Sequence, residues 1–397
     1  MLRLDPESIG VKGMSKRKVA VMQCASYHTE ELIRKIDEGA DALGGWGLWL
    51  KTEMNVLLKV NLIAPVPSDS AAVTHCEFVR AVTRILKRQG CNVWIGDSAG
   101  GAIGGKVQTG KSFTVSGIEK VAAEEGAEVK NFDKEGVVEV KALNGEPMFL
   151  AKPMFDADFV INLPKFKTHM AATYTGAIKN LFGCVPGQKK AEYHKVAQAA
   201  RPFGEILCGI NKAVKPGLNI MDGVMAMDKQ GPISGGVYKA EKILLSEDPL
   251  ALDAVAVEMM GLHISNLPTY SSSIEQGIGE WRMKHIEVCG DFNLPPRLTD
   301  FRVPKILMKE NGKGGGALGV IVDLMKTRPE VDIKKCKKCN VCVASCPVKA
   351  IDEETKQIDY NKCIECMCCH ELCVSKAVKL VKVNRIMRLL SHLKKQG

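Results

Sequence analysis

The chain has 397 residues, of which 46% are apolar and 25% charged, and its formal net charge is +10. This composition is ordinary for a globular protein and excludes disordered, collagen-like and coiled-coil chains. No run of about 18 apolar residues occurs, so the sequence predicts no membrane span, and the length suggests two or three domains.

Cysteine content and charge both change near residue 330. Six of the 15 cysteines precede this point and nine follow it, and residues 331–397 carry 14 Lys/Arg against 7 Asp/Glu. We therefore divide the chain into a large domain over residues 1–310, in one or two lobes, a Gly-rich linker over 311–330, a cysteine-rich module over 331–382 and a basic amphipathic helix over 383–397.

Strands and helices alternate along the large domain. The predicted strands cover residues 18–25, 55–62, 91–98, 127–132, 156–164, 218–223 and 242–248. The predicted helices cover 29–43, 116–125 and a segment that begins at a capping box from Thr74 to Glu77 and ends at Gly90. Asn144-Gly145 predicts a hairpin turn. This order predicts an α/β fold, a mostly parallel sheet with flanking helices.

Polar side chains follow four of these strands, where each strand ends. They are Lys59 and Asn61, then Asp97, then Asn162, Lys165, Lys167, Thr168 and His169, then Asp222. The carboxyl ends of parallel strands meet at one edge of a sheet, where α/β proteins bind ligands. Pro164 favours an irregular, ligand-facing segment after the strand over 156–164.

Lys179 and Asn180 stand near the start of another predicted helix, and a helix N-terminus with lysines attracts anions. We assign His169 as proton donor, with Lys165 and Asp222 also catalytic. The residues expected to bind an anionic substrate are Lys59, Asn61, Asp97, Asn162, Lys167, Thr168, Lys179 and Asn180. His194 is a second candidate acid. The alternative is that all of these are capping residues, turn residues and solvated lysines.

Gly105–Ser112 matches the phosphate-binding pattern G-x4-GK[ST]. A phosphate-binding loop runs directly from a strand into a helix, but the nearest predicted strand ends several residues earlier. We therefore expect Lys111 not to bind a nucleotide.

The cysteine-rich module contains the same spacing twice. Cys336, Cys339, Cys342 and Cys346 follow C-x2-C-x2-C-x3-C, and Cys363, Cys366, Cys369 and Cys373 repeat it 27 residues later. Thiolates suit iron, whereas zinc sites usually use two separated cysteine pairs. The signal-free N-terminus predicts a cytoplasmic protein, in which a disulfide scaffold is improbable.

This module resembles a bacterial-type ferredoxin with two [4Fe-4S] clusters. The resemblance implies that the fourth cysteine of each run binds the other cluster. One ligand set is then Cys336, Cys339, Cys342 and Cys373, and the other is Cys363, Cys366, Cys369 and Cys346. Val374 departs from the pattern, which has Pro there, and Cys368 is an additional thiol that we expect to be a bystander.

Lysines crowd the first cysteine run, at positions 334, 335, 337 and 338. They should raise the potential of a cluster or dock an acidic redox partner. The runs lack interleaved aromatic residues, so we expect no nucleic-acid binding. The basic helix over 383–397 should pack on the protein, with membrane-surface or partner binding as the alternative.

The large domain is similar to the DUF362 family. The similarity rests on KVNL (59–62), GDS (96–98), NLPKFKTH (162–169), TGAIKNLFG (175–183), DGVMAMDKQGP (222–232) and the spacing of Asp248 and Asp253. A ferredoxin module is common in that family, whose activity is not established.

Three functions remain open from the sequence. The first is an oxidoreductase in which two [4Fe-4S] clusters exchange electrons with an anionic small molecule. A flavin could pass electrons between the clusters and the substrate, but the sequence contains no dinucleotide-binding fingerprint. The second is an electron carrier or iron–sulfur delivery protein, with Cys24 and Cys184 as transfer thiols. The third is a nucleotide-driven reductase.

Overall fold

The computed structural model describes residues 16–100, 102–103, 106–170, 172–187, 189–197, 199–304 and 327–382. The predicted helix over 383–397 and most of the predicted linker lie outside these ranges. The last linker residues are not a loop, because strand β15 covers Thr327–Val331. Within the described ranges, no helix is both long enough and apolar enough to cross a bilayer.

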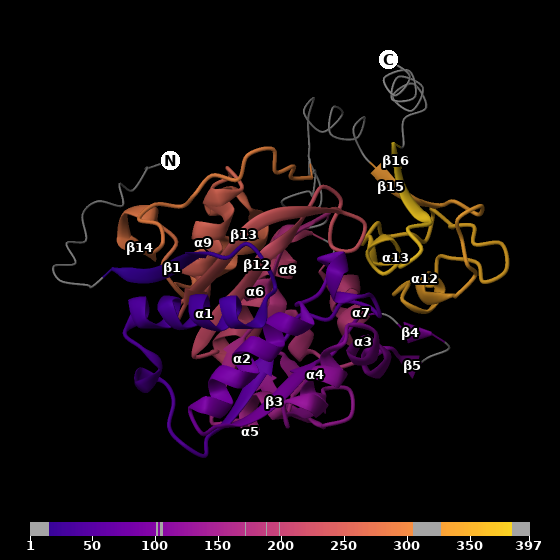
Figure 1. Cartoon of the computed structure of the whole chain (residues 1–397). Coiled ribbons are helices and arrows are strands. Elements are labelled where there is room, and N and C mark those ends of the chain that lie inside the picture. The colour runs from indigo at the N-terminus through magenta and orange to yellow at the C-terminus, as the bar shows by residue number, and fades with distance from the viewer. Residues whose placement is uncertain are drawn as a thin grey trace.

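A mixed β-sheet forms the centre of the large domain (Figure 1). Its strand order is β14-β1-β13-β12-β9-β2-β3-β6. In that order the strands cover Ile286–Gly290, Arg17–Gln23, Gly236–Ser246, Leu218–Asp228, Phe159–Asn162, Asn55–Lys59, Asn92–Asp97 and Glu128–Asn131. Along this path β13 is antiparallel to β1 and β12, and the other pairings are parallel. The predicted α/β fold with a mostly parallel sheet is confirmed.

Helices cover both faces of the sheet, because alternate strand residues point to opposite sides. Ala20 and Met22 of β1 share a core with residues of α1 (Thr29–Leu43), α2 (Cys76–Arg88) and α4 (Ile118–Glu124). Val19 and Val21 of the same strand share the opposite core with residues of α8 (Ala200–Val214) and α9 (Pro249–Met259). Burial on both faces explains why these strands read as continuous apolar runs.

Helix boundaries agree with the prediction at α1 and, to within two residues, at α4, which was expected over 116–125. Helix α3 (Thr109–Val115) was not predicted; it precedes α4 and is separated from it by Gly117, whose φ is 80°. The prediction of a capping box that begins at Thr74 is wrong. His75 is the N-cap of α2, and its ring accepts a hydrogen bond from the Glu77 backbone. The Thr74 hydroxyl accepts one from the Asn61 backbone instead.

Strands β12 and β13 are longer than expected and form an antiparallel pair of 11-residue strands. The hairpin at Asn144-Gly145 is confirmed, joining β7 (Val137–Lys141) to β8 (Pro147–Ala151). The segment after Pro164 is a strand with one register shift, between Lys165 and Lys167, rather than the irregular segment expected. It is strand β10 (Lys165–His169), parallel to β12 and antiparallel to β11 (Thr173–Thr175).

The cysteine module pairs β15 with β16 (Val378–Lys382) and contains two short helices, α12 (Val341–Ala344) and α13 (Cys368–Glu371). It lies beside α7 (Lys189–Val196), β4 (Ala102–Ile103) and β5 (Lys106–Val107) of the large domain (Figure 1). The contact is close at Gly100, where an added Cβ would lie 2.8 Å from a methyl group of Leu372. The module thus packs against the edge where the strands β2 and β3 end.

Candidate functional site

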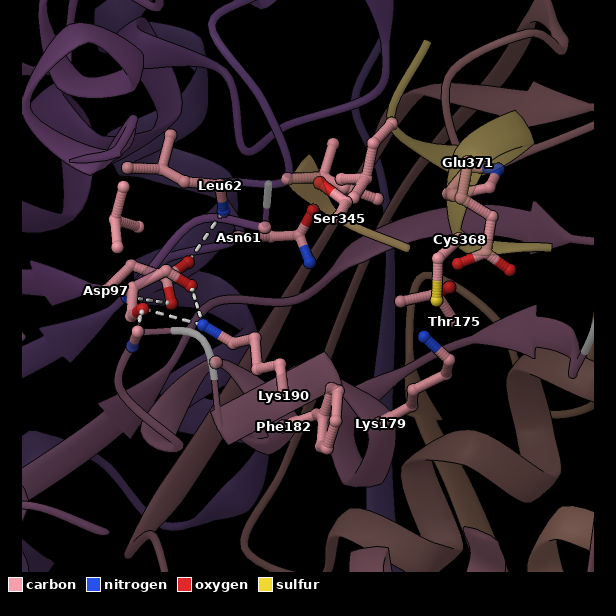
Figure 2. A pocket seen from close by; sticks show the side chains of 18 of the residues that line it. Asn61, Leu62, Asp97, Thr175, Lys179, Phe182, Lys190, Ser345, Cys368 and Glu371 are labelled. Carbon is pink, nitrogen blue, oxygen red and sulfur yellow. Dashed lines mark hydrogen bonds between the residues drawn. The ribbon is translucent and has the colours of Figure 1, made fainter. Parts of the chain in front are cut away.

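A cavity of about 430 Å³ lies between the α/β domain and the cysteine module (Figure 2). The α/β domain lines it with predicted site residues and with others: Asn61, Asp97, Thr175, Lys167, His169, Lys179, Asn180, Phe182 and Lys190. The module contributes Ser345, Cys346, Cys368, Glu371 and Leu372, among others. Because both parts supply its walls, the cavity exists only when the module is docked.

Strand β10 brings Lys167 and His169 to this cavity but not Lys165. A register shift separates Lys165 from Lys167 along the pairing with β12. The Lys165 ammonium lies 2.7 Å from Asp222 Oδ2 and 2.7 Å from the Tyr27 hydroxyl, and both Lys165 and Asp222 are fully buried. These two predicted catalytic residues therefore form an ion pair outside the cavity lining.

The His169 ring has a defined orientation between the two parts of the protein. Its Nδ1 accepts a hydrogen bond of 3.1 Å from the Ala172 backbone. The proton of a neutral ring must then be on Nε2, which lies 3.4 Å from Glu371 Oε1. His169 can therefore donate a proton on the cavity side.

Lys59 does not line the cavity, but it forms an ion pair with Asp97, which does. The Lys59 ammonium lies 2.9 Å from Asp97 Oδ1, and Asp97 Oδ2 accepts a hydrogen bond of 2.6 Å from the Leu62 backbone. Burial raises the pKa of Asp97, and Lys59 opposes this effect. The chain passes so close at Gly183 that an added Cβ would lie 2.2 Å from Asp97 Oδ1.

Four asparagine side chains form a continuous chain of hydrogen bonds behind Lys167. The Lys167 ammonium donates to Asn61 Oδ1 (2.7 Å), and Asn61 donates to Asn180 Oδ1 (2.7 Å). Asn180 then donates to Asn162 (2.7 Å), which donates to Asn219 (2.9 Å). Asn61 and Asn180 line the cavity, whereas Asn162 lies one step deeper, so its role is to orient the others.

The expected anion site at a helix N-terminus is occupied by the protein's own carboxylate. Helix α6 covers only Ala177–Asn180, and the backbone N–H groups of Ala177 and Ile178 donate to Asp253 at 2.7 and 3.0 Å. The Tyr270 hydroxyl donates to Asp253 as well (3.0 Å). Asp253 therefore fixes the turn that presents Lys179 to the cavity.

Three other residues considered in the sequence, Thr168, His194 and Lys111, contribute no described side chain to the cavity lining. The Thr168 hydroxyl donates to the Lys229 carbonyl and accepts from the Gly231 backbone, so it is used within the fold. The side chain of His194 is not among those described. Lys111 lies on the exposed surface of α3 and does not line the cavity.

The sequence analysis missed Lys190, Thr175, Ser345 and Glu371. The Lys190 ammonium donates to the Ser98 carbonyl and hydroxyl, and Figure 2 shows it at the Asp97 end of the cavity. Thr175 begins the motif TGAIKNLFG, whereas no local pattern marks Lys190, Ser345 or Glu371, because the tertiary fold brings them to the cavity from separate elements.

Burial lowers the pKa of Lys167 and Lys179, and it lowers the pKa of Lys190 to about 8. Burial also raises the pKa of Glu371 to about 7, against the effect of Lys179 and Lys167. The lining is thus rich in amines that are costly to bury as cations. An anion in the cavity would stabilise their charged forms.

The cysteine module contains two further cavities. One is lined by Cys336, Cys339, Cys342 and Cys373, and the other by Cys346, Cys363, Cys366 and Cys369 together with Cys368. The fourth cysteine of each run therefore lies with the first three of the other run. Each half contains an equivalent N–H···S contact of 3.2 Å. The Ala350 backbone donates to Cys346 Sγ, and the Ala377 backbone donates to Cys373 Sγ.

The nine cysteines of the module, all among the described residues, form no disulfide bond. Within the described part of the chain, no group of three His, Cys, Asp or Glu side chains has the geometry to hold a single metal ion.

The two kinds of cavity share a wall. Cys346 and Cys368 line both the large cavity and the second cysteine cavity. A ligand in the large cavity would thus lie next to whatever the second cysteine set holds.

Comparisons with known proteins place the chain in a family. Residues 56–258 match the family described as "Domain of unknown function (DUF362)". The chain is 31% identical over 304 residues to a thylakoid-associated protein of Synechocystis sp., an alignment that covers 73% of this chain and 92% of that protein.

Two solved structures are more distantly similar. The lactate racemase apoprotein from Thermoanaerobacterium thermosaccharolyticum has a TM-score of 0.38 at 14% identity, and a protein from Thermotoga maritima has 0.35 at 13%. The alignments cover 62% and 55% of this chain and 56% of each of those chains. On the family match and the Synechocystis relative, the chain belongs to the DUF362 family.

Proposed function

We propose that this protein is an iron–sulfur oxidoreductase that exchanges electrons with an anionic small molecule in the large cavity. The observation that carries the proposal is the shared wall, since Cys346 and Cys368 line both that cavity and a cysteine-lined cavity. Without that shared wall, an electron carrier that binds no substrate would fit the sequence equally well.

Two sets of four thiolates suit two [4Fe-4S] clusters, which would supply one electron each. Cys336, Cys339, Cys342 and Cys373 would hold one, and Cys363, Cys366, Cys369 and Cys346 the other. The fit rests on two observations: each set surrounds its own cavity, and backbone N–H groups point at Cys346 and Cys373.

The residues of the large cavity would bind and protonate the ligand. The ammonium groups of Lys167, Lys179 and Lys190 attract an anion, and burial between two domains excludes water from it. His169 Nε2–H is the proton donor, oriented by the Ala172 backbone. We assign no contact with substrate to Lys165 and Asp222, whose ion pair holds β10 against β12.

The test is metal analysis and EPR on anaerobically purified full-length protein. We expect about eight iron and eight sulfide per chain. Cys346→Ser should halve the iron, with loss of the signal that depends on Cys363, whereas the adjacent-thiol control Cys368→Ser should keep the full iron content. Stoichiometric zinc without visible absorption would contradict the proposal.

A second measurement separates an enzyme from a carrier. Adding small carboxylates or inorganic phosphate to the reduced protein should shift the EPR signal of the Cys346 cluster and leave the other signal unchanged. If iron is complete and neither signal responds to any of these anions, the protein is an electron carrier.

A further inference from the structure

The two cysteine sets of the module differ in their exposure to solvent. Of the 15 cysteines of the chain, all of which are described, only Cys339 of the first set is exposed, whereas Cys369 of the second set is buried. Cys346 of the second set lines the large cavity, and none of the four described cysteines of the first set does. The second set therefore borders the α/β domain, and the first set is the one that reaches solvent.

Four lysines surround the exposed cysteine. Residues 333–339 read IKKCKKC, and the lysines at positions 334, 335, 337 and 338 are all exposed. To the residues that the structure describes, none of these four ammonium groups forms an ion pair, whereas Lys362 near the second run pairs with Asp359. The segment thus presents four positive charges to solvent without a paired acidic side chain.

The internal repeat of the module shows that its fold does not need these lysines. At the offset of 27 residues, the second run has YNKCIEC over residues 360–366, with one Lys and one Glu where the first run has four Lys and no acid. The backbone is equivalent in the two runs, since Lys338 and Glu365 have φ values of 51° and 54°. The same turn therefore forms with a large positive charge or with none, so the lysines have a role other than building it.

Two exposed apolar side chains accompany the lysines. Ile333 is 54% exposed and begins the segment, and Val374 is 44% exposed and follows Cys373, which lines the same cavity as Cys336. Protein interfaces combine an apolar centre with a polar or charged rim. We call residues 333–339 together with Val374 the basic surface.

We propose that the basic surface docks an acidic electron-carrier protein, one that holds a [2Fe-2S] cluster or a flavin. This inference rests on the proposed function, since it names the redox partner of the same module. Opposite charges steer two proteins together and fix their orientation. Docking here would bring the carrier next to the cysteine set that does not line the large cavity, so the carrier and the small-molecule ligand would not compete for one face of the module.

The test is calorimetric titration of anaerobically purified full-length protein with a plant-type [2Fe-2S] ferredoxin, which is acidic, and with cytochrome c, a basic carrier. The ferredoxin should bind and cytochrome c should not. Raising the salt concentration from about 20 mM to about 500 mM should weaken ferredoxin binding by a factor of about ten or more, because salt screens exposed charges.

Two double variants locate the binding surface. Lys337→Glu combined with Lys338→Glu should weaken ferredoxin binding by a factor of about ten or more, because it places two negative charges on the basic surface. The matched control is Lys51→Glu combined with Lys284→Glu, which makes the same change in net charge at two exposed lysines of the α/β domain. The control should bind ferredoxin as the unmodified protein does. If the first variant loses iron, Lys334→Glu combined with Lys335→Glu tests the same surface.

Three outcomes would overturn the inference. They are an equal loss of binding in the variant and its control, unchanged binding in the variant of the basic surface, and tighter binding of single-stranded DNA than of ferredoxin.

Iron analysis and the anion-dependent EPR shift of the same samples distinguish this inference from the proposed function. Complete iron and a response to anions, but no ferredoxin binding, would contradict the inference alone. Zinc in place of iron, in protein that still binds ferredoxin, would contradict the iron–sulfur function and leave the basic surface as a docking site.

Discussion

Two apolar cores, one on each face of the sheet, hold the α/β domain together, whereas the core of the cysteine module consists of Ile351, Cys369 and Val378 with a few half-buried neighbours. Domains with so little apolar surface to bury usually need metal ions or disulfides. The described cysteines of the module form no disulfide bond. We therefore expect the large domain to fold by its own packing, and the module to need the clusters proposed for its cysteines.

Loss of the proposed clusters should produce the largest difference between the two regions. Oxidative loss of the clusters, or Cys363→Ser combined with Cys366→Ser, should unfold residues 327–382 and leave the sheet intact. Hydrogen exchange measured by mass spectrometry should show lost protection in the module and unchanged protection in β12 and β13. A module that stays protected without iron would show that its small apolar core is sufficient.

Asp253→Asn should cause the largest effect within the α/β domain. Asp253 is fully buried and accepts from two backbone N–H groups and from Tyr270, and an amide NH2 would oppose one of these donors. We expect a loss of about 2–3 kcal/mol at pH 5 in urea unfolding. The control is Asp156→Asn, a half-exposed partner of Lys152, which should change stability by less than about 0.5 kcal/mol.

The same pair of variants tests a smaller, pH-dependent effect. Burial raises the pKa of Asp253 from 3.8 to about 7, so the folded state holds this proton more tightly than the unfolded state does. The contribution of Asp253 to stability is complete below pH 3.8 and is lost as pH rises toward 7. The stability difference between Asp253→Asn and the unmodified protein should therefore narrow over this range. A constant difference would mean that the carboxyl group is ionised throughout.

The smallest effect is expected at the phosphate-loop-like segment. Lys111 is exposed on α3, and the nearest strand, β5, spans only Lys106–Val107 in a separate two-stranded sheet. Lys111→Ala should leave stability within about 0.5 kcal/mol. We also expect neither the unmodified protein nor this variant to bind ATP in calorimetry. ATP affinity that disappears in this variant would support the nucleotide-driven alternative.

Local patterns in the sequence predicted the features that depend on neighbouring residues. The periodicity of residues 29–43 predicted α1, and Asn144-Gly145 predicted the β7–β8 hairpin, because turn and helix preferences act over a few positions. The repeated cysteine spacing likewise predicted two groups of thiols, and the clusters proposed for them are still a prediction. The motifs at the strand ends identified the family.

Only the tertiary structure decided which polar residues share the cavity. Lys165 and Lys167 look equivalent in the sequence, but the register shift beside β12 sends one to Asp222 and the other to Asn61. The turn before Lys179 is held by Asp253, far along the chain. Thr175 and Ser345 line one cavity only because the cysteine module docks on the α/β domain. Contacts between distant segments leave no periodicity or spacing in the sequence, so no local pattern could have predicted them.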